Sequence, residues 1–304
     1  MTAPPGGLVP RGSSPKGPIP PFGHPSLEGR GKGALPLSAG KGVGGIGLIG
    51  LCLCAAVLLA SCGPVPPPKN AYSSGPDLIA DMTALREKAR TLRASGRVDH
   101  FGEEHRVQGK VFVFAQLPSR LRVDLLSPFG NTLSVLTVDE GRFAMSDLKE
   151  GRYMEGPAEP CNIARLIRIP LPADDVVRIL VGHTPLIEGE SVVEWNREGY
   201  YEVTIADGAR KQVLRVGPHE GVLPLLRSTL EEGGEVVLDI ELARWSRAGE
   251  HQVPREIRIE MPHQKVDLLL RYDDDGVETD VDLPEDAWKQ VFPAGVEVES
   301  VTCD

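Results

Sequence analysis

Aromatic and basic residues are both scarce in this sequence. Aromatic side chains make up 5% of the 304 residues, and 33 Lys and Arg stand against 43 Asp and Glu. Without residues 1–61, which hold five basic residues and one acidic residue, the formal charge falls to about −14. A chain this acidic is poorly suited to neutralising a phosphate backbone, so we expect no nucleic-acid partner.

Catalytic motifs are also missing. The sequence has no Ser-centred nucleophile elbow, and no strand precedes the Gly-rich stretch Gly40–Gly45 that would make it a nucleotide-binding loop. The close pair His100 and His105, with Glu103 and Glu104 between them, is compatible with a metal site or with a charged, exposed hairpin. Because a further anchored ligand is lacking, we favour the hairpin. The sequence therefore predicts no enzyme, no cofactor and no metal site.

One long apolar run is present, at Val43–Cys62, and it ends at a cysteine. A basic flank, an apolar run and small residues at its end are typical of a secretory signal peptide. Leu59–Cys62 resembles the lipobox of bacterial lipoproteins, which implies cleavage before Cys62 and acylation of its thiol. An uncleaved membrane anchor is the alternative, because the run is near the lower limit for a span. We interpret residues 1–61 as a leader with a lipoprotein signal peptide.

Gly63 rather than Asp follows the lipidated cysteine. By the same resemblance, this favours the outer membrane, with the lipid-anchored protein facing the periplasm. That compartment is oxidising, which permits a disulfide between Cys161 and Cys303. Their geometry cannot be derived from the sequence, so two separate thiols remain the alternative.

The mature chain begins with a tether and a helix. Residues 62–76 are rich in Pro and then in Ser and Gly, which predicts an extended tether without a core. From Asp77 to Gly96, apolar residues recur at helical spacing, so we predict one amphipathic helix there. Its apolar positions are Leu78, Met82, Leu85, Ala89 and Leu92.

Short strand patterns dominate the remainder of a domain at residues 77–304. Apolar and charged residues alternate at 238–242 and 257–261, which is typical of an antiparallel sheet with one solvated face. Asp273–Gly276 favours a hairpin turn, and helices are predicted around Ile163–Ile167 and Val176–Val181. We predict a mainly β fold with a few helices, in which about eleven strands form a curved sheet covered by the helices.

The stretch Ser127–Gly130 predicts a tight surface turn with an aromatic residue at its tip. Ser127, Pro128 and Gly130 suit the first, second and fourth positions of a type I turn. The third position is Phe129, where a polar residue is expected. The ring either protrudes toward something apolar or folds back onto the core, and we favour the protruding arrangement.

Two segments resemble the LolB-like outer-membrane lipoprotein receptors of the LolA/LolB superfamily. They are Arg120–Leu136, with the order strand-Pro-apolar-Gly-strand, and Pro170–Gly182. The resemblance implies an incomplete antiparallel β-barrel with a helical lid, whose apolar cavity receives lipoprotein acyl chains from a periplasmic LolA-like carrier. It also assigns Pro128, Phe129 and Gly130 to a membrane-insertion loop.

We therefore expect an outer-membrane lipoprotein, acting as a monomer, that binds acyl chains and helps to transfer or insert lipoproteins. The alternative is a structural or envelope-assembly lipoprotein of the same fold, which binds another lipid or a protein partner, or whose concave face is an ordinary filled core. Candidate lining residues of such a cavity are Phe112, Phe114, Val123, Leu125, Leu133, Val135, Met145, Leu171, Val177 and Leu180, and those on strands depend on the strand parity.

Overall fold

The structure, a computed structural model, describes residues 63–101, 106–218 and 222–303. Residues Cys62–Asp304 form one compact unit. Within the described ranges, no helix has the length and apolar character needed to cross a bilayer. The helices are α2 (Gly75–Arg86), α3 (Pro160–Ile167) and α4 (Ala173–Leu180), with short 3-10 turns η1 (Pro262–Gln264) and η2 (Glu285–Trp288).

Strands account for most of the regular structure, as predicted. They are β1 (Thr91–Phe101), β2 (Arg106–Gln116), β3 (Arg120–Leu126), β4 (Thr132–Asp139), β5 (Arg142–Asp147), β6 (Arg152–Pro157), β7 (Glu190–Trp195), β8 (Tyr201–Asp207), β9 (Arg210–Val216), β10 (Leu225–Glu232), β11 (Glu235–Ala243), β12 (Ser246–Ala248), β13 (His251–Val253), β14 (Glu256–Met261), β15 (Val266–Thr279) and β16 (Val298–Ser300).

Fourteen of these strands form one open sheet. Their order is β16-β6-β5-β4-β3-β2-β1-β15-β14-β11-β10-β9-β8-β7, and β12 and β13 form a separate hairpin. The mainly β prediction is confirmed, but the sheet has fourteen strands rather than about eleven. It is also mixed, because β16 pairs with β6 in parallel. In the described chain the end strands β7 and β16 do not pair, so the sheet is not closed.

The predicted helix from Asp77 to Gly96 was wrong in its second half. The helix follows the N-cap Ser74 and ends at Arg86, and Thr91 already starts β1. Long-range pairing decides this, because β1 is held between β2 on one side and β15 on the other. Local periodicity is a weak preference that such tertiary pairing overrides.

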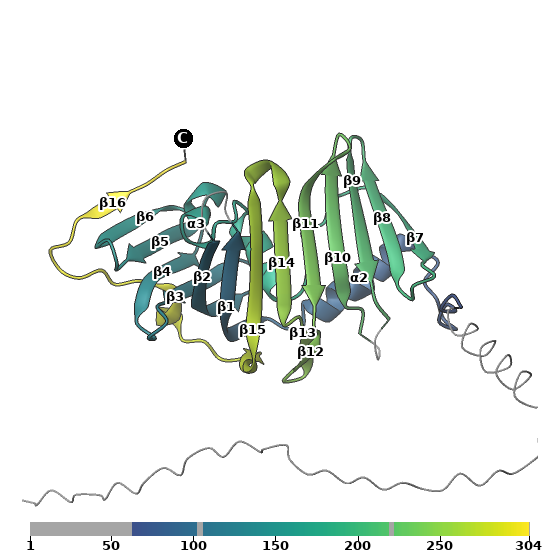
Figure 1. The fold of residues 1–304 in the computed structure, drawn as a ribbon, viewed down its shortest axis with the longest axis horizontal. Coiled ribbons are helices and arrows are strands. Elements are labelled where there is room, and N and C mark those ends of the chain that lie inside the picture. Colours follow the sequence, from purple (N-terminus) through teal and green to yellow (C-terminus); the bar gives the residue numbers. More distant parts are fainter. Residues whose placement is uncertain (1–62, 102–105, 219–221, 304) are drawn as a thin grey trace, which may run out of the picture. The chain divides into compact units, whose positions relative to one another are not determined.

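Asp273–Gly276 does not form the hairpin turn predicted for it. These residues lie inside β15, where Ala94 pairs with Val277 but Gly96 pairs with Tyr272. The extra residues therefore form a bulge, a device that bends a long strand and increases its twist. Figure 1 shows the result, with β4–β6 lying at a steep angle to β8–β11 across the strongly twisted sheet.

Helices α3 and α4 cover one part of the sheet and α2 another. Helix α3 packs against β4, α4 against β2 and β3, and α2 against β7. Helix α4 stops at Gly182, whose φ of 92° and close approach to Trp245 exclude a side chain, since an added Cβ would lie 2.6 Å from the indole. We call β1–β6, β14, β15, α3 and α4 the hollow half, and β7–β11 with α2 the packed half.

The packed half has a filled core. Val203, Leu214 and Ile240 are completely buried. Tyr201 makes edge contacts with Tyr72 and with Trp195, at ring-centroid distances of 5.5 and 4.9 Å. Aromatic contacts of this kind add to the free energy gained by burial.

Val65, in the segment predicted as an extended tether, contacts the packed half. Trp195 Nε1 donates to the backbone oxygen of Val65 at 2.9 Å, and the Val65 amide donates to Arg197 O at 2.9 Å. The start of the described chain is thus held beside the β7–β8 turn.

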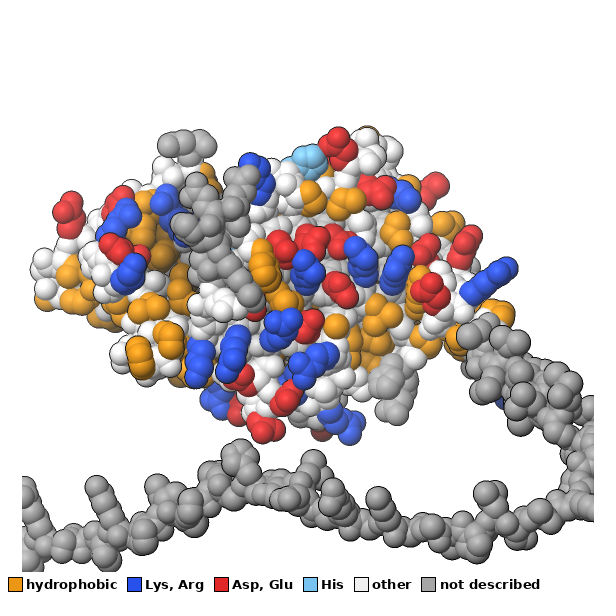
Figure 2. Space-filling model, viewed as in Figure 1, with side chains coloured by type: hydrophobic (Ala, Val, Ile, Leu, Met, Phe, Trp, Pro, Cys, Tyr) orange, Lys and Arg blue, Asp and Glu red, His pale blue; other side chains and the backbone are white. Residues whose placement is uncertain are grey.

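The opposite face of the sheet is solvated. Figure 2 shows Lys and Arg side chains interleaved with Asp and Glu over its middle strands. Cross-strand ion pairs such as Arg227 with Asp239 and Arg258 with Asp267, each at 2.9 Å, lie there. The arginines of these pairs are partly exposed whereas Asp239 is buried, and the charged side chains keep this face of the sheet polar.

Candidate functional site

A cavity of about 240 Å³ lies in the hollow half, between the sheet and the helices α3 and α4. The strands and the covering helices both contribute mainly Val, Leu and Ile side chains. The lining consists of Val98, His100, Val111, Val113, Val123, Leu125, Ser134, Met145, Asp147, Arg165, Leu166, Ile167, Arg168, Ile169, Val176, Ile179, Leu180, Ile257, Ile259, Leu268 and Leu270. Most of these side chains are aliphatic, so the cavity suits a hydrocarbon.

A few polar groups interrupt this lining. Arg165 on α3 donates from Nε to Asn162 Oδ1 at 3.1 Å, and Arg168 follows the helix in an exposed position. Burial lowers the pKa of His100, and the positive charge of Arg168 lowers it further. His100 is therefore neutral near pH 7, and the cationic groups of the lining are two arginines at the α3 end.

The structure places four of the ten predicted lining residues at the cavity: Val123, Leu125, Met145 and Leu180. The prediction of which β2 side chains face the cavity was wrong. Phe112 is 44% exposed on the other face, and the ring of Phe114 lies 6.0 Å from the Arg122 guanidinium there. Because side chains alternate along a strand, the neighbours Val111 and Val113 line the cavity instead.

The other four predicted residues do not line the cavity. Val135 and Leu171 are buried, Val177 is fully buried in α4, and Leu133 is half-buried at the start of β4. On β4, Ser134 faces the cavity. Both faces of this strand are covered, since Ser134 to Val138 are all buried. Gln290, just after η2, covers the other face by donating to Val135 O at 3.2 Å and to Ala144 O at 2.7 Å.

Sequence reasoning missed the side of the cavity formed by β14 and β15. Ile257, Ile259, Leu268 and Leu270 line it, although they lie more than a hundred residues after β3. Their alternation with charged residues was a usable signal for an apolar face. The pairing of β15 with β1, which brings them to the cavity, has no local signal.

The turn between β3 and β4 presents Phe129 to solvent. Its side chain is 92% exposed. The Gly130 amide donates to Ser127 O at 2.9 Å, and the Asn131 amide donates to Ser127 Oγ at 3.1 Å. Two hydrogen bonds therefore stabilise the turn. Gly130 has φ of 86°, a conformation that favours glycine. The ring is thus held outward on a well-defined turn.

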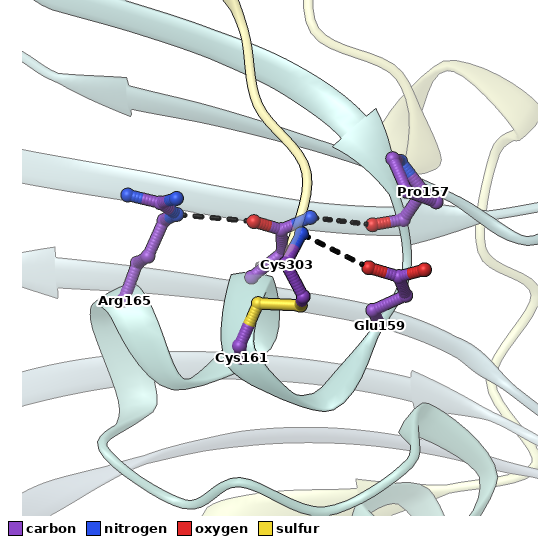
Figure 3. The surroundings of a disulfide bond; sticks show 6 residues. Pro157, Glu159, Cys161, Arg165 and Cys303 are labelled. Carbon is purple, nitrogen blue, oxygen red and sulfur yellow. Dashed lines mark hydrogen bonds between the residues drawn. A yellow bond between two sulfur atoms is a disulfide. The ribbon is translucent and has the colours of Figure 1, made fainter.

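Cys161 and Cys303 form a disulfide that ties α3 to the end of the chain (Figure 3). Their Cα atoms are 6.0 Å apart. The Cys303 amide donates to Glu159 Oε2 at 3.2 Å, and Asn162 donates to Pro157 O at 3.0 Å. The bond joins residues 142 positions apart, and in the chain-entropy model a loop of this length stabilises a fold by about 4 to 5 kcal/mol.

One predicted site and part of a motif considered above lie outside the described residues. Cys62, the predicted lipidation site, is one, and His105 with Glu103 and Glu104 is the other. Across the described ranges, one group has the spacing of a metal site, formed by Glu159, Cys161 and Cys303. The disulfide uses both of its sulfur atoms.

Comparison with known proteins places this geometry in context. No family model matches the sequence. The chain is 26% identical over 130 residues to the outer-membrane lipoprotein LolB of Hamiltonella defensa subsp. Acyrthosiphon pisum (strain 5AT), a match that covers 41% of this chain. The chain spans about 60% of the length of that curated relative.

Two solved structures share most of the fold. A putative outer membrane lipoprotein-sorting protein domain from Vibrio parahaemolyticus matches 69% of this chain and 94% of its own, with 9% identity and a TM-score of 0.50. A DUF1329 family protein from Desulfovibrio piger ATCC 29098 matches 71% of this chain and 95% of its own, with 13% identity and a TM-score of 0.51. The resemblance seen in the sequence is confirmed: the chain is LolB-like and has the fold of a lipoprotein-sorting domain.

Proposed function

We propose that this protein binds acyl chains in the cavity of the hollow half and helps to transfer or insert lipoproteins into the outer membrane. The observation that carries the proposal is the aliphatic cavity of about 240 Å³ beneath α3 and α4. The relative with 26% identity is an outer-membrane lipoprotein, which supports the same location for this chain. Acylated Cys62 would hold the protein there, facing the periplasm.

The size of the cavity fits the first part of an acyl chain. An apolar cavity of about 150 Å³ holds a benzene ring, so 240 Å³ holds a short run of methylenes. Each buried methylene contributes about 0.8 kcal/mol. A longer chain requires α3 and α4 to shift outward, and its own methylenes then replace the contacts that these helices lose with the sheet.

Transfer of this kind makes and breaks no covalent bond. A periplasmic LolA-like carrier would pass the acyl chains of a lipoprotein to this cavity. Because the two proteins would bind the chains with similar affinity, the transfer costs little free energy. The turn of Pro128, Phe129 and Gly130 then contacts the bilayer. Its aromatic ring, 92% exposed, suits the interface between headgroups and hydrocarbon.

Native mass spectrometry of residues 63–304, purified from a bacterial periplasm, tests acyl binding. This unit contains the whole described core, so it is suitable without its lipid. We expect co-purified phospholipid or lipopeptide, and uptake of a fluorescent fatty acid by emptied protein. A clean apo mass together with no uptake would refute the proposal and favour a structural lipoprotein with a different partner.

Phe129→Glu separates delivery from binding. A charge at the tip of the turn opposes entry into the interface, so we expect vesicle association and lipoprotein delivery to fall about tenfold or more while fatty-acid uptake stays unchanged. Val192→Glu is the control, because Val192 is 64% exposed on β7 at the far end of the strand order. If both variants lose lipoprotein delivery equally, the turn has no specific role in delivery.

A further inference from the structure

A second pocket, of about 360 Å³, lies where the ends of α2 and α4 meet the turn between β2 and β3. It shares no lining residue with the acyl cavity. Helix α4 separates the two, with Ile179 and Leu180 facing the cavity and Arg178 the pocket. The pocket is lined by Arg86, Glu87, Arg90, Gln116, Leu117, Pro118, Arg178, Val181 and His183.

The pocket concentrates positive charge in an acidic protein. Three arginines line it, and the single carboxylate of the lining is Glu87. Among the described residues, no carboxylate forms a salt bridge with Arg86 or with Arg178. The lining therefore carries an excess of two positive charges.

Arg86 is buried with one donor unused. Its side chain is 5% exposed, and its Nη1 donates to Gln252 O at 2.7 Å. The guanidinium lies 4.8 Å from the centre of the Trp245 ring, which fixes its plane. Its Nε has no hydrogen-bond partner, and neither has the buried Nε of Arg178 in the same pocket.

The backbone at this site does not supply the missing acceptors. The carbonyls at the two helix ends already accept backbone bonds, from the Glu87 amide to Thr83 O and from the His183 amide to Arg178 O, each at 2.9 Å. Burial lowers the pKa of Arg86 to about 10, which reflects the cost of keeping its charge out of water. An unpaired buried charge is costly, and an anion in the pocket would offset the positive charge of both guanidinium groups.

We propose that this pocket binds a phosphate group through Arg86 and Arg178. A phosphate monoester offers several acceptor oxygens and carries nearly two negative charges, which matches the excess of two positive charges in the lining. A carboxylate carries only one negative charge. Guanidinium groups also bind phosphate oxygens with a fixed, directional geometry that a lysine lacks.

The test is isothermal titration calorimetry of residues 63–304 with inorganic phosphate and with dihexanoyl phosphatidic acid, at constant ionic strength set with chloride. Wild type should bind, and Arg178→Gln should weaken binding about tenfold or more. Arg178 is only half-buried, so its replacement should keep the fold, which thermal denaturation checks. Arg97→Gln, an exposed arginine on β1, is the matched control and should bind as wild type does.

The source of the phosphate is resolved in a Val113→Trp background, in which the new indole fills the acyl cavity and removes chain binding there. Tighter binding of phosphatidic acid than of inorganic phosphate in this background assigns the pocket to a lipid headgroup, and equal binding assigns it to a free phosphate. No binding of either, or undiminished binding in Arg178→Gln, would overturn the proposal. Because acyl uptake is measured separately, this result is independent of the proposed transfer function.

Discussion

The hollow and packed halves belong to one sheet yet differ in how their inner face is filled. In the hollow half, four of the six side chains by which β1–β3 line the cavity are valine: Val98, Val111, Val113 and Val123. In the packed half, the corresponding core uses larger residues, among them Tyr201, Ile205, Leu214, Leu225 and Ile240, each no more than 2% exposed. The comparison indicates that short side chains on β1–β3 leave room for the cavity, which the apolar faces of α3 and α4 cover.

The largest effect should come from truncating the same residue type in each half. Leu214→Ala leaves a void in a filled core, which typically costs about 2 to 5 kcal/mol. Leu268→Ala enlarges a cavity that already exists and removes fewer contacts, so we expect a value at or below the lower end of that range. Urea denaturation of both variants measures the difference. Equal costs would contradict the distinction between the halves.

Filling the cavity should abolish acyl binding without unfolding the protein. Val113→Trp directs an indole into the cavity, so we expect fatty-acid affinity to fall about tenfold or more. Phe112→Trp is its matched control, since Phe112 is the neighbouring residue on the opposite face and 44% exposed. Fluorescence titration with a labelled fatty acid compares the two. Retained binding in Val113→Trp would place the acyl chain elsewhere.

Local patterns were sufficient for much of the fold. The order strand-Pro-apolar-Gly-strand expected for Arg120–Leu136 matches β3 (Arg120–Leu126), the turn and the start of β4 (Thr132–Asp139). The covering helices α3 and α4 were predicted from clusters of apolar residues and a glycine stop, and Gly182 does end α4. Such signals are local, so they can be interpreted without knowing which strands pair.

Features that depend on distant pairing were not predictable. The residues after Arg86 have a helical pattern but become β1, and Asp273–Gly276 has turn chemistry but lies within β15. Both outcomes follow from the pairing of β1 with β15, which are far apart in the chain. The lining was misassigned at Phe112 and Phe114 for a related reason, since a shift of one residue moves every side chain of a strand to the other face.

The smallest predicted effect concerns His183, which joins the two halves. Its ring is 4% exposed and its Nε2 lies 3.4 Å from Thr83 Oγ1 of α2, in the packed half, while its own segment follows α4 of the hollow half. Burial lowers the pKa of His183, and the charges of Arg178 and Arg86 add to this, while the backbone hydrogen bond to Thr184 and the carboxylate of Glu87 oppose it. The folded state therefore holds this histidine neutral.

This shift makes the folded state less stable in mild acid. Below the ordinary histidine pKa of 6.5, the unfolded chain takes up a proton that the folded chain resists, so stability falls as the pH drops from 6.5 toward the lower folded-state pKa. The loss is at most about 1.4 kcal/mol per pH unit for one group. Denaturation between pH 7.5 and 5.5 should show this slope, and His183→Gln should flatten it. Because the pKa of His100 shifts in the same direction, the comparison is made in a His100→Gln background. If the free energy of unfolding depends on pH equally in His100→Gln and in the double variant, protonation of His183 does not destabilise the folded state.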